Sequence, residues 1–487
     1  MFRAMPARAL PDVDESRPSG GAPLEVPRVV ACALGAVAPV VVVGLAPRAL
    51  AHGVVVVALT ALCLFSCALL GRALARAPLR AALVVVIALR APLLFTSPVL
   101  SDDVYRTVHE ARASRVALDL PYRVAPADLT LPYDDDVTSR VNHPTVRAAY
   151  PPFTQLFYVV VVALGDAVRA PIAAAKAALL ALDVLLILVL ARARRRDDDQ
   201  APALAYGAHP LPLVALGLGP HTDVLGALLV CGALLVARAA RRPRDHAIAG
   251  FLVGLGAHVK PLAVLALLEV RGRALLGFVV GALAPAVPYL LLGAPLLDGV
   301  LSYATRWRAQ PILFPLFEAP FSSWSEARAR ADVYMHAHVD VASAAILVEE
   351  SGRPLFGFGG VGDGARAVLL DGAFFARALA ALCFGIVVVV VVRKVSRARR
   401  VECALLAYLL LTPTAHPWYF LWVLPLGALS ASSSTTLACT AAIGLYAEKV
   451  AALTDRAPPH GAVTSLVVLG ALTLGWWRDR SRGPRVD

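Results

Sequence analysis

The sequence has 487 residues, of which 59% are hydrophobic and 16% charged, and its net charge at pH 7 is +12. A mean hydropathy of +0.70 excludes a soluble protein of this length, because too few polar residues remain to build its exterior. The charge is almost all arginine at the ends of apolar stretches, which indicates lipid headgroups as partners and excludes nucleic acid.

The chain opens with residues 1–27, which are rich in Pro, Asp and Glu, carry no signal-peptide pattern and predict a disordered cytoplasmic tail. Apolar stretches then recur, each near the length that crosses a hydrocarbon layer about 30 Å thick. The predicted spans are 29–46, 50–71, 81–97, 151–168, 171–191, 202–218, 222–239, 247–268, 273–293, 371–392, 401–415, 418–430, 433–451 and 461–477. The sequence therefore predicts an all-α, polytopic transmembrane helical bundle of about 12–14 membrane segments.

Two long polar stretches interrupt the spans and divide the chain into parts. We expect an N-terminal transmembrane catalytic module over residues 28–293, and within it a large external loop over residues 98–150. A second external loop follows over residues 294–370, then C-terminal transmembrane helices over residues 371–477 and a cytoplasmic tail over residues 478–487. The seven cysteines all lie in apolar stretches, so neither a disulfide framework nor a zinc site is expected.

The orientation of the spans follows from their basic flanks. The positive-inside rule places three basic stretches in the cytoplasm: 71–80, 393–400 and 476–487. Counting spans then puts both long loops outside, but it also puts the basic stretches 191–196 and 240–244 there. This conflict disappears if two middle segments are re-entrant or broken, and the candidates are YPPF (150–153), HPLP (209–212) and HVKP (258–261).

An acid pair, Asp102 and Asp103, follows the third predicted span directly. Tyr105 and Arg106 come next at helical spacing, so a short amphipathic helix on the membrane would hold the acids at its start. An acid near a helix N-terminus is favoured as the carboxylate, the form that acts as a general base. Solvated headgroup-level charges at the end of a span are the alternative interpretation.

The surrounding motifs resemble a known family. The series SDDVYR, LPYRVAP, NHP and YPP over residues 101–152 resembles the GT-C superfamily of membrane glycosyltransferases, and most of all the bacterial polyprenyl-phosphate-mannose-dependent mannosyltransferase-like proteins. The resemblance implies a GT-C-like fold that moves a sugar, with mannose favoured, from a polyprenyl-phosphate donor to an acceptor hydroxyl, with inversion. It also implies a multi-pass protein of the bacterial inner membrane whose site faces the periplasm or exterior.

Later segments extend the resemblance and also depart from it. GPHTD (219–223), HVKPLAVL (258–265), YATRWRAQ (303–310) and TAHPWYFLWVLPL (414–426) are similar to segments of the same group. Thr222 stands where the group has Asn, Ala309 and Gln310 depart from a Phe-Asn pair, and Glu110 stands where Asp is expected. The departure at Ala309 and Gln310 argues against a sugar-contacting role for those two positions, and Glu110 implies a local difference in the helix after the acids.

The resemblance and the residue types together define the candidate site. The resemblance favours Asp102 as the general base, with Asp103 orienting the acceptor or a cation. A leaving phosphate needs cationic or hydrogen-bonding groups, and Arg306, Arg308 and His416 are candidates. Ionisable groups at membrane depth usually face a cavity, which makes His221, Asp223 and Lys260 candidates for binding. The alternative for Lys260 is that it pairs with Asp223. The predicted substrate-binding residues are Tyr105, Arg106, His143, Tyr150, His221, Asp223, Lys260, Trp307, Arg308, His416 and Tyr419.

No cofactor is expected with certainty beyond the donor substrate, and no metal ligands are assigned, although two adjacent acids permit a divalent cation without demanding one. The expected partners are membrane lipid, the lipid-linked sugar donor and a glycan, glycolipid or protein acceptor. Two other functions stay open. A transporter or flippase for lipid-linked saccharides would place its charges near the midplane and show repeat symmetry. A scaffold subunit would tolerate substitution of both acids.

Overall fold

The computed structural model describes residues 25–47, 53–193, 201–270, 272–321, 372–453 and 461–481. Regular structure in these ranges is helical, apart from one parallel bridge between Ala309 and Thr414. Five of the described helices are long and apolar enough to cross a membrane: α1 (Val26–Leu45), α2 (Gly53–Leu74), α7 (Pro171–Arg192), α19 (Gly372–Lys394) and α24 (Gly461–Ser481). The expectation of an all-α polytopic membrane protein is confirmed. Residues 1–24 of the predicted tail, 322–371 of the second loop and 482–487 lie outside the described residues.

Other passes through the bundle consist of two or three short pieces in series. Proline causes most of these breaks, because it lacks the N–H that a continuing helix needs; Pro92, Pro210 and Pro425 each stand at or next to the start of a second piece. The composite passes are α3 (Leu79–Ala88) with η2 (Ala91–Phe95), α8 (Ala201–Gly207) with α9 (Pro210–Gly217), η8 (Pro417–Trp422) with α21 (Leu424–Ser430), and α22 (Ser433–Ala441) with η9 (Ala442–Leu445) and α23 (Tyr446–Leu453).

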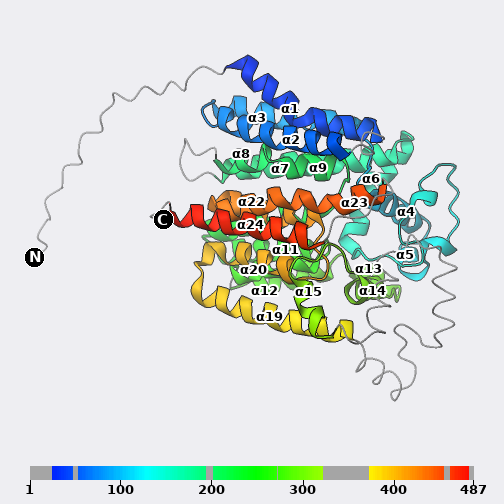
Figure 1. Ribbon diagram of the computed structural model, residues 1–487. Coiled ribbons are helices and arrows are strands. Elements are labelled where there is room, and N and C mark those ends of the chain that lie inside the picture. The colour runs from blue at the N-terminus through cyan, green and yellow to red at the C-terminus, as the bar shows by residue number, and fades with distance from the viewer. Residues whose placement is uncertain are drawn as a thin grey trace, which may run out of the picture.

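The remaining elements complete the bundle and the cap over one of its ends. They are α4 (Asp103–Val116), α5 (Leu120–Arg123), α6 (Pro152–Ala167), α10 (Asp223–Ala239), α11 (Pro243–Ala257), η5 (Pro261–Leu268), α12 (Ala274–Leu283), α13 (Val287–Leu291), α14 (Asp298–Arg306), α15 (Phe314–Glu318) and α20 (Arg400–Leu411). Figure 1 shows α4, α5, α13 and α14 gathered at the end of the bundle opposite the C-terminus of α24.

Helices α11 and α12 touch backbone to backbone through small residues. Gly250 and Gly254 on α11 face Gly277 and Gly281 on α12, and each pair has the GxxxG spacing that lets two helices approach closely. A Cβ added at Gly277 would lie 1.8 Å from the carbonyl oxygen of Ala247. The two helices therefore pack side by side at short range, and α11 leads into residues 258–260.

The end of the bundle opposite α4 and α14 is rich in arginine, and we name it the basic end. There Arg238 of α10 donates to the carbonyl of Ala398 at 2.8 Å, and Arg397 donates to the carbonyl of Glu269 at 2.9 Å. The carboxylate of Asp479 accepts the N–H of Ser433 at 2.9 Å. The last turn of α10, the end of η5, the start of α20 and the end of α24 therefore lie together.

One predicted span, 151–168, is wrong as a crossing. Helix α6 lies along α4, since Tyr158 and Val162 pack with Val104 and Val108, and Asp166 at its far end pairs with Arg115 at 2.7 Å. Helix α7 starts beside the same cluster, so α6 keeps the chain at one end of the bundle. An apolar helix of 16 residues is about 24 Å long, close to the thickness of a hydrocarbon layer, so its length alone does not show whether it crosses a membrane.

The predicted span 247–268 is also corrected, because the chain turns back inside it. Helix α11 runs away from the basic end, residues 258–260 form the turn, and η5 returns to Glu269. These two changes bring the C-terminal end of α7 and the turn between α10 and α11 to the basic end (Figure 1). The topology conflict is thereby resolved through YPPF and HVKP. The third candidate, HPLP, is a real break between α8 and α9 within a pass that continues.

Candidate functional site

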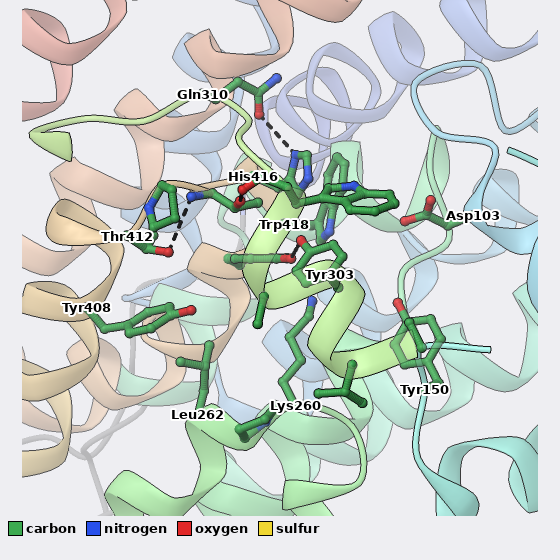
Figure 2. Close-up of a pocket in the computed structure, with 18 of the residues that line it drawn as sticks. Asp103, Tyr150, Lys260, Leu262, Tyr303, Gln310, Tyr408, Thr412, His416 and Trp418 are labelled. Carbon is green, nitrogen blue, oxygen red and sulfur yellow. Dashed lines mark hydrogen bonds between the residues drawn. The ribbon is translucent and has the colours of Figure 1, made fainter. Parts of the chain in front are cut away.

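A cavity of about 650 Å³ opens at the end of the bundle that carries α4 and α14. One side is polar and includes Asp102, Asp103, His416 and Lys449. The other side is an apolar arm between η5, α19 and α20, lined by Leu262, Val264, Leu265, Ala380, Ala381, Phe384 and Leu411. Figure 2 shows Leu262 and Tyr408 on the side of the cavity away from Asp103. The cavity thus joins a charged chamber to an apolar channel.

The acid pair stands at the start of α4, as the sequence predicts. Asp103 is the first residue of the helix, and its Oδ1 accepts a hydrogen bond from Nδ2 of Asn142 at 2.7 Å. Its Oδ2 lies 3.4 Å from Nδ1 of His221. Burial raises the pKa of the Asp103 carboxyl, but His221 and Asn142 outweigh this effect and hold that pKa well below its usual range. Asp103 is therefore a carboxylate that Asn142 holds through one oxygen and that His221 approaches at the other.

Asp102 has a different environment from its neighbour. It is the residue before the first turn of α4, and its side chain makes no capping hydrogen bond there. Its Oδ2 lies 3.7 Å from Nζ of Lys449, and 41% of the side chain is exposed, against 31% for Asp103. Asp102 thus faces the chamber with a single cation beside it.

Three aromatic rings form a stack next to the acids. The indole of Trp418 lies between the rings of His221 and His416, with ring centroids 3.7 Å and 4.3 Å apart and nearly parallel planes. Nδ1 of His416 lies 3.3 Å from Oε1 of Gln310. Figure 2 shows His416 and Trp418 between Gln310 and Asp103. The stack connects the GPHTD segment (219–223) to the late His-Pro-Trp-Tyr segment (416–419).

The floor of the chamber contains a buried ion pair. Lys260 donates to Oδ1 of Asp223, which also accepts Nε1–H of Trp422 at 2.7 Å. The ammonium of Lys260 lies 3.7 Å from the centre of the Tyr419 ring. Asp223 is fully buried, whereas Lys260 is 14% exposed and lines the cavity. The predicted pairing of these two residues is confirmed, and only the lysine reaches the chamber.

The chain was compared with known proteins. A family model described as alpha-(1->6)-mannopyranosyltransferase, N-terminal domain, matches residues 27–275. This match covers more than half of the chain and includes both acids, His221 and Lys260.

The chain belongs to the alpha-(1->6)-mannopyranosyltransferase family. No curated protein and no solved structure matches it. Membership in this family supports the activity of a mannosyltransferase, and the resemblance to GT-C mannosyltransferases stated from the motifs is confirmed.

Several predicted binding residues of this mannosyltransferase line the same cavity. His143 has a positive φ of 46°, and its ring meets that of Trp307 edge-on with centroids 4.6 Å apart. Tyr303 stacks on Trp307, and its hydroxyl bonds to that of Tyr419. Tyr150 completes this wall. The wall is aromatic, which suits contact with the apolar face of a sugar.

Two predicted binding residues on α4 instead hold the first loop in place. Tyr105 is 4% exposed in the core between α4 and α6, beneath the guanidinium of Arg140. Arg106 reaches the edge of the cavity, but its Nε donates to Glu110 at 2.7 Å and its other nitrogens donate to backbone carbonyls within residues 142–147. Arg106 therefore orders the loop that carries Asn142.

Arg308 does not line the cavity, because it pairs with Glu318 at 2.8 Å. The side chain of Arg306 lies outside the described part of the structure. Lys449 and Arg377 are cations on the cavity wall that sequence reasoning missed. Lys449 carried a usable signal, since it is one of four lysines and interrupts an apolar stretch. Sequence reasoning also missed Trp418 as a site residue, although it lies within the HPWY segment (416–419) that resembles the family.

Within the described ranges, no three His, Cys, Asp or Glu side chains gather in a cluster that could hold a metal ion. In the chamber, the acids meet nitrogen atoms instead, from Asn142, His221 and Lys449.

Proposed function

We propose that this mannosyltransferase takes mannose from a polyprenyl-phosphate donor and transfers it, with inversion, to an acceptor hydroxyl at the outer face of a bacterial inner membrane. The observation that carries the proposal is the junction in one cavity of an acid-bearing chamber and an apolar arm. A polyprenyl-phosphate sugar has the same division, because its sugar and phosphate are polar and its lipid chain is not.

The apolar arm is suited to the lipid chain of the donor. Its walls come from η5, α19 and α20, and α19 presents Leu382 and Ile386 outward with 62% and 56% exposed. A helix with apolar residues on its outer surface adjoins the hydrocarbon of a bilayer. The donor would therefore reach the chamber from the membrane, past a cavity wall that includes Arg377, which donates to the carbonyl oxygen of Trp307.

The chemistry requires one proton transfer and one leaving group. The acceptor oxygen attacks the anomeric carbon, and the bond from that carbon to the phosphate oxygen breaks, so that the phosphate leaves with the electron pair. Asp102 takes the acceptor proton, because its carboxylate faces the chamber and is not held by neutral donors. Asp103, fixed by Asn142 and His221, orients the acceptor.

Cations near the acids would stabilise the charge that develops on the leaving phosphate. Lys449 lies 3.7 Å from Asp102, and Lys260 reaches the chamber floor. In this role they replace Arg308, whose guanidinium is engaged with Glu318.

The arginine distribution supports an outward-facing chamber. The described arginines Arg238, Arg397 and Arg399 lie at the basic end, opposite the cavity. Under the positive-inside rule that end faces the cytoplasm, so the acids face the exterior or periplasm.

Transfer by the purified protein in lipid vesicles tests the proposal. The assay supplies labelled polyprenyl-phosphate mannose and a pool of cell-envelope acceptors. We expect Asp102→Asn to lower the transfer rate by about 100-fold or more, with donor binding retained. Asp136→Asn is a matched control, because Asp136 lies in the same loop with 71% of its side chain exposed. No transfer by the wild-type protein, together with translocation of lipid-linked saccharide that neither acid affects, would refute the proposal and favour a transporter.

A further inference from the structure

One buried lysine has no place in the chemistry above. Lys176 lies on α7 with 2% of its surface exposed, in a pass made of apolar residues. Nζ donates to the carbonyl oxygen of Thr96, to Oγ1 of Thr96 at 2.5 Å and to the carbonyl oxygen of Gly217 at 2.8 Å. No carboxylate lies within ion-pair distance of it in the described ranges. Burying an ammonium without a counter-charge costs several kcal/mol, so its position calls for a physical reason.

The acceptors of Lys176 are the ends of two helices. Thr96 directly follows η2, and Gly217 is the last residue of α9. The C-terminus of a helix carries partial negative charge on its unpaired carbonyls, and a cation there is stabilised. Lys176 thus joins two helix ends from different parts of the chain with one charged group.

The two chain segments that leave these helix ends lead to the acid site. Residues 97–103 run from Thr96 to Asp103, and residues 218–221 run from Gly217 to His221. They are joined by a hydrogen bond of 2.8 Å from the N–H of Leu100 to the carbonyl of Leu218. Asp103 and His221 then meet at their tips, 3.4 Å apart. The hydrogen bonds of Lys176, which we name the lysine clamp, therefore lie at the start of residues 97–103 and 218–221. The contact between Asp103 and His221 lies at the other end of the same two segments.

The packing around the clamp leaves little freedom for either segment. A Cβ at Gly44 of α1 would lie 2.4 Å from Cβ of Thr96, and a Cβ at Gly217 would lie 2.7 Å from Val40. The lysine is the charged part of a junction that is otherwise close-packed.

A second polar contact on the same face of α7, between Asp183 and Arg90, also joins α7 to the pass formed by α3 and η2. Asp183 is two helical turns after Lys176 and pairs with Arg90 at 2.7 Å. Arg90 also donates to the carbonyl of Val86 at 2.8 Å, so it joins α7 to the break between α3 and η2. Helix α7 therefore holds the same composite pass at two levels, and the level nearer the acids is the one with Lys176.

We propose that Lys176 is a positioning residue for the transfer reaction: it fixes the segments 97–103 and 218–221 so that Asp103 and His221 meet at the chamber. This inference rests on the proposed function. A displacement near 1 Å at a reacting centre can lower a rate by about 100-fold. We therefore expect Lys176→Met to lower kcat by about 10- to 100-fold and to leave KM for the donor within about twofold.

The activity test is a double-mutant cycle with His221→Ala. If Lys176 acts through the Asp103–His221 contact, Lys176→Met costs little more in a protein that already lacks His221. Losses that multiply fully would overturn the proposal, because they would show that Lys176 acts independently of the Asp103–His221 contact. Lys394→Met is a matched control, since Lys394 is exposed at the end of α19 and makes the same chemical change.

A second measurement does not need activity. Hydrogen exchange followed by mass spectrometry, on the full chain in lipid nanodiscs, reports the protection of the Leu100 amide. We expect Lys176→Met to accelerate exchange in peptides that cover 97–105 and 217–225, with unchanged exchange in α22 and α24. Unchanged exchange in the first two regions would overturn the proposal, and so would equal acceleration everywhere. If the wild-type protein transfers no sugar, the proposed function fails while this measurement still decides the role of Lys176.

Discussion

The contact between α11 and α12 predicts that a glycine-to-alanine substitution lowers the stability of the protein, which is the opposite of what helix propensity predicts. Replacing glycine by alanine inside a helix usually stabilises it by about 0.5–1 kcal/mol. At Gly277, however, the new Cβ would stand 1.8 Å from the carbonyl oxygen of Ala247. An ordinary carbon–oxygen contact is about 3.3 Å or longer, so the two helices would have to separate by roughly 1.5 Å.

The cost of this separation exceeds the gain in helix propensity. Overpacking a tight interface costs about 1–3 kcal/mol, and the other glycine contacts between these two helices would be lengthened too. A gap of 0.5–1 Å already forfeits roughly a quarter to a half of a dispersion contact. We therefore expect Gly277→Ala to destabilise the protein by about 1–2 kcal/mol net.

The assay is thermal unfolding of purified protein in nanodiscs, followed by tryptophan fluorescence. Gly385→Ala on α19 is the matched control, because nothing lies within 4 Å of the Cβ it would add. The midpoint should fall for Gly277→Ala and stay equal or rise for Gly385→Ala. A midpoint for Gly277→Ala at or above that of the wild type would refute the reasoning on backbone contact.

Three further predictions concern the chamber. A Cβ at Gly219 would lie 2.9 Å from Nε2 of His221, so Gly219→Ala should lower kcat about tenfold or more with an unchanged melting midpoint; an unchanged kcat would contradict this. The low pKa of Asp103 means that its contribution to stability is complete above the unfolded value of about 3.9 and is lost progressively as pH falls from there through the lower folded value; melting midpoints measured between pH 2 and 7 should fall below about pH 4, and Asn142→Ala, which raises the folded pKa, should make this acid-dependent fall smaller. Lys449→Met should lower kcat more than it raises KM for the donor, because the lysine stabilises charge that develops on the phosphate only as it leaves, as steady-state transfer rates would show.

The acid site could be predicted from the sequence only where its members are neighbours in the chain. Asp102 and Asp103 are adjacent, follow an apolar stretch and precede a helical pattern, so local reasoning finds them. Lys449 is far from them in sequence, and its approach to Asp102 depends on how α23 returns to the chamber. Long-range contacts of this kind leave no spacing that a single sequence can display.

The roles of α4 residues were also beyond sequence reasoning. Tyr105, Arg106 and Glu110 have the polar groups of a binding site, yet the structure uses Arg106 and Glu110 to hold the loop and Tyr105 to fill the core. Glu110 also accepts a hydrogen bond from Gln155 at 2.7 Å, which gives a structural reason for a glutamate at this position.

The path of the chain through the bundle could also be predicted only in part. Apolar composition alone cannot separate α6, which lies along α4, from a short crossing helix, because both need the same residues. The prolines of YPPF and HVKP did mark where the chain changes direction, since each breaks the run of backbone hydrogen bonds.

The walls of the cavity come from both halves of the chain. The acids, His143 and Lys260 precede residue 275, where the family match ends, whereas Arg377, Phe384, His416 and Lys449 follow it. Neither part of the cavity belongs to one stretch alone, since Lys449 lines the chamber beside the acids and Leu262 of η5 lines the apolar arm beside Phe384. The two stretches must therefore vary together in evolution, because a change on either side alters the surface that the other side faces.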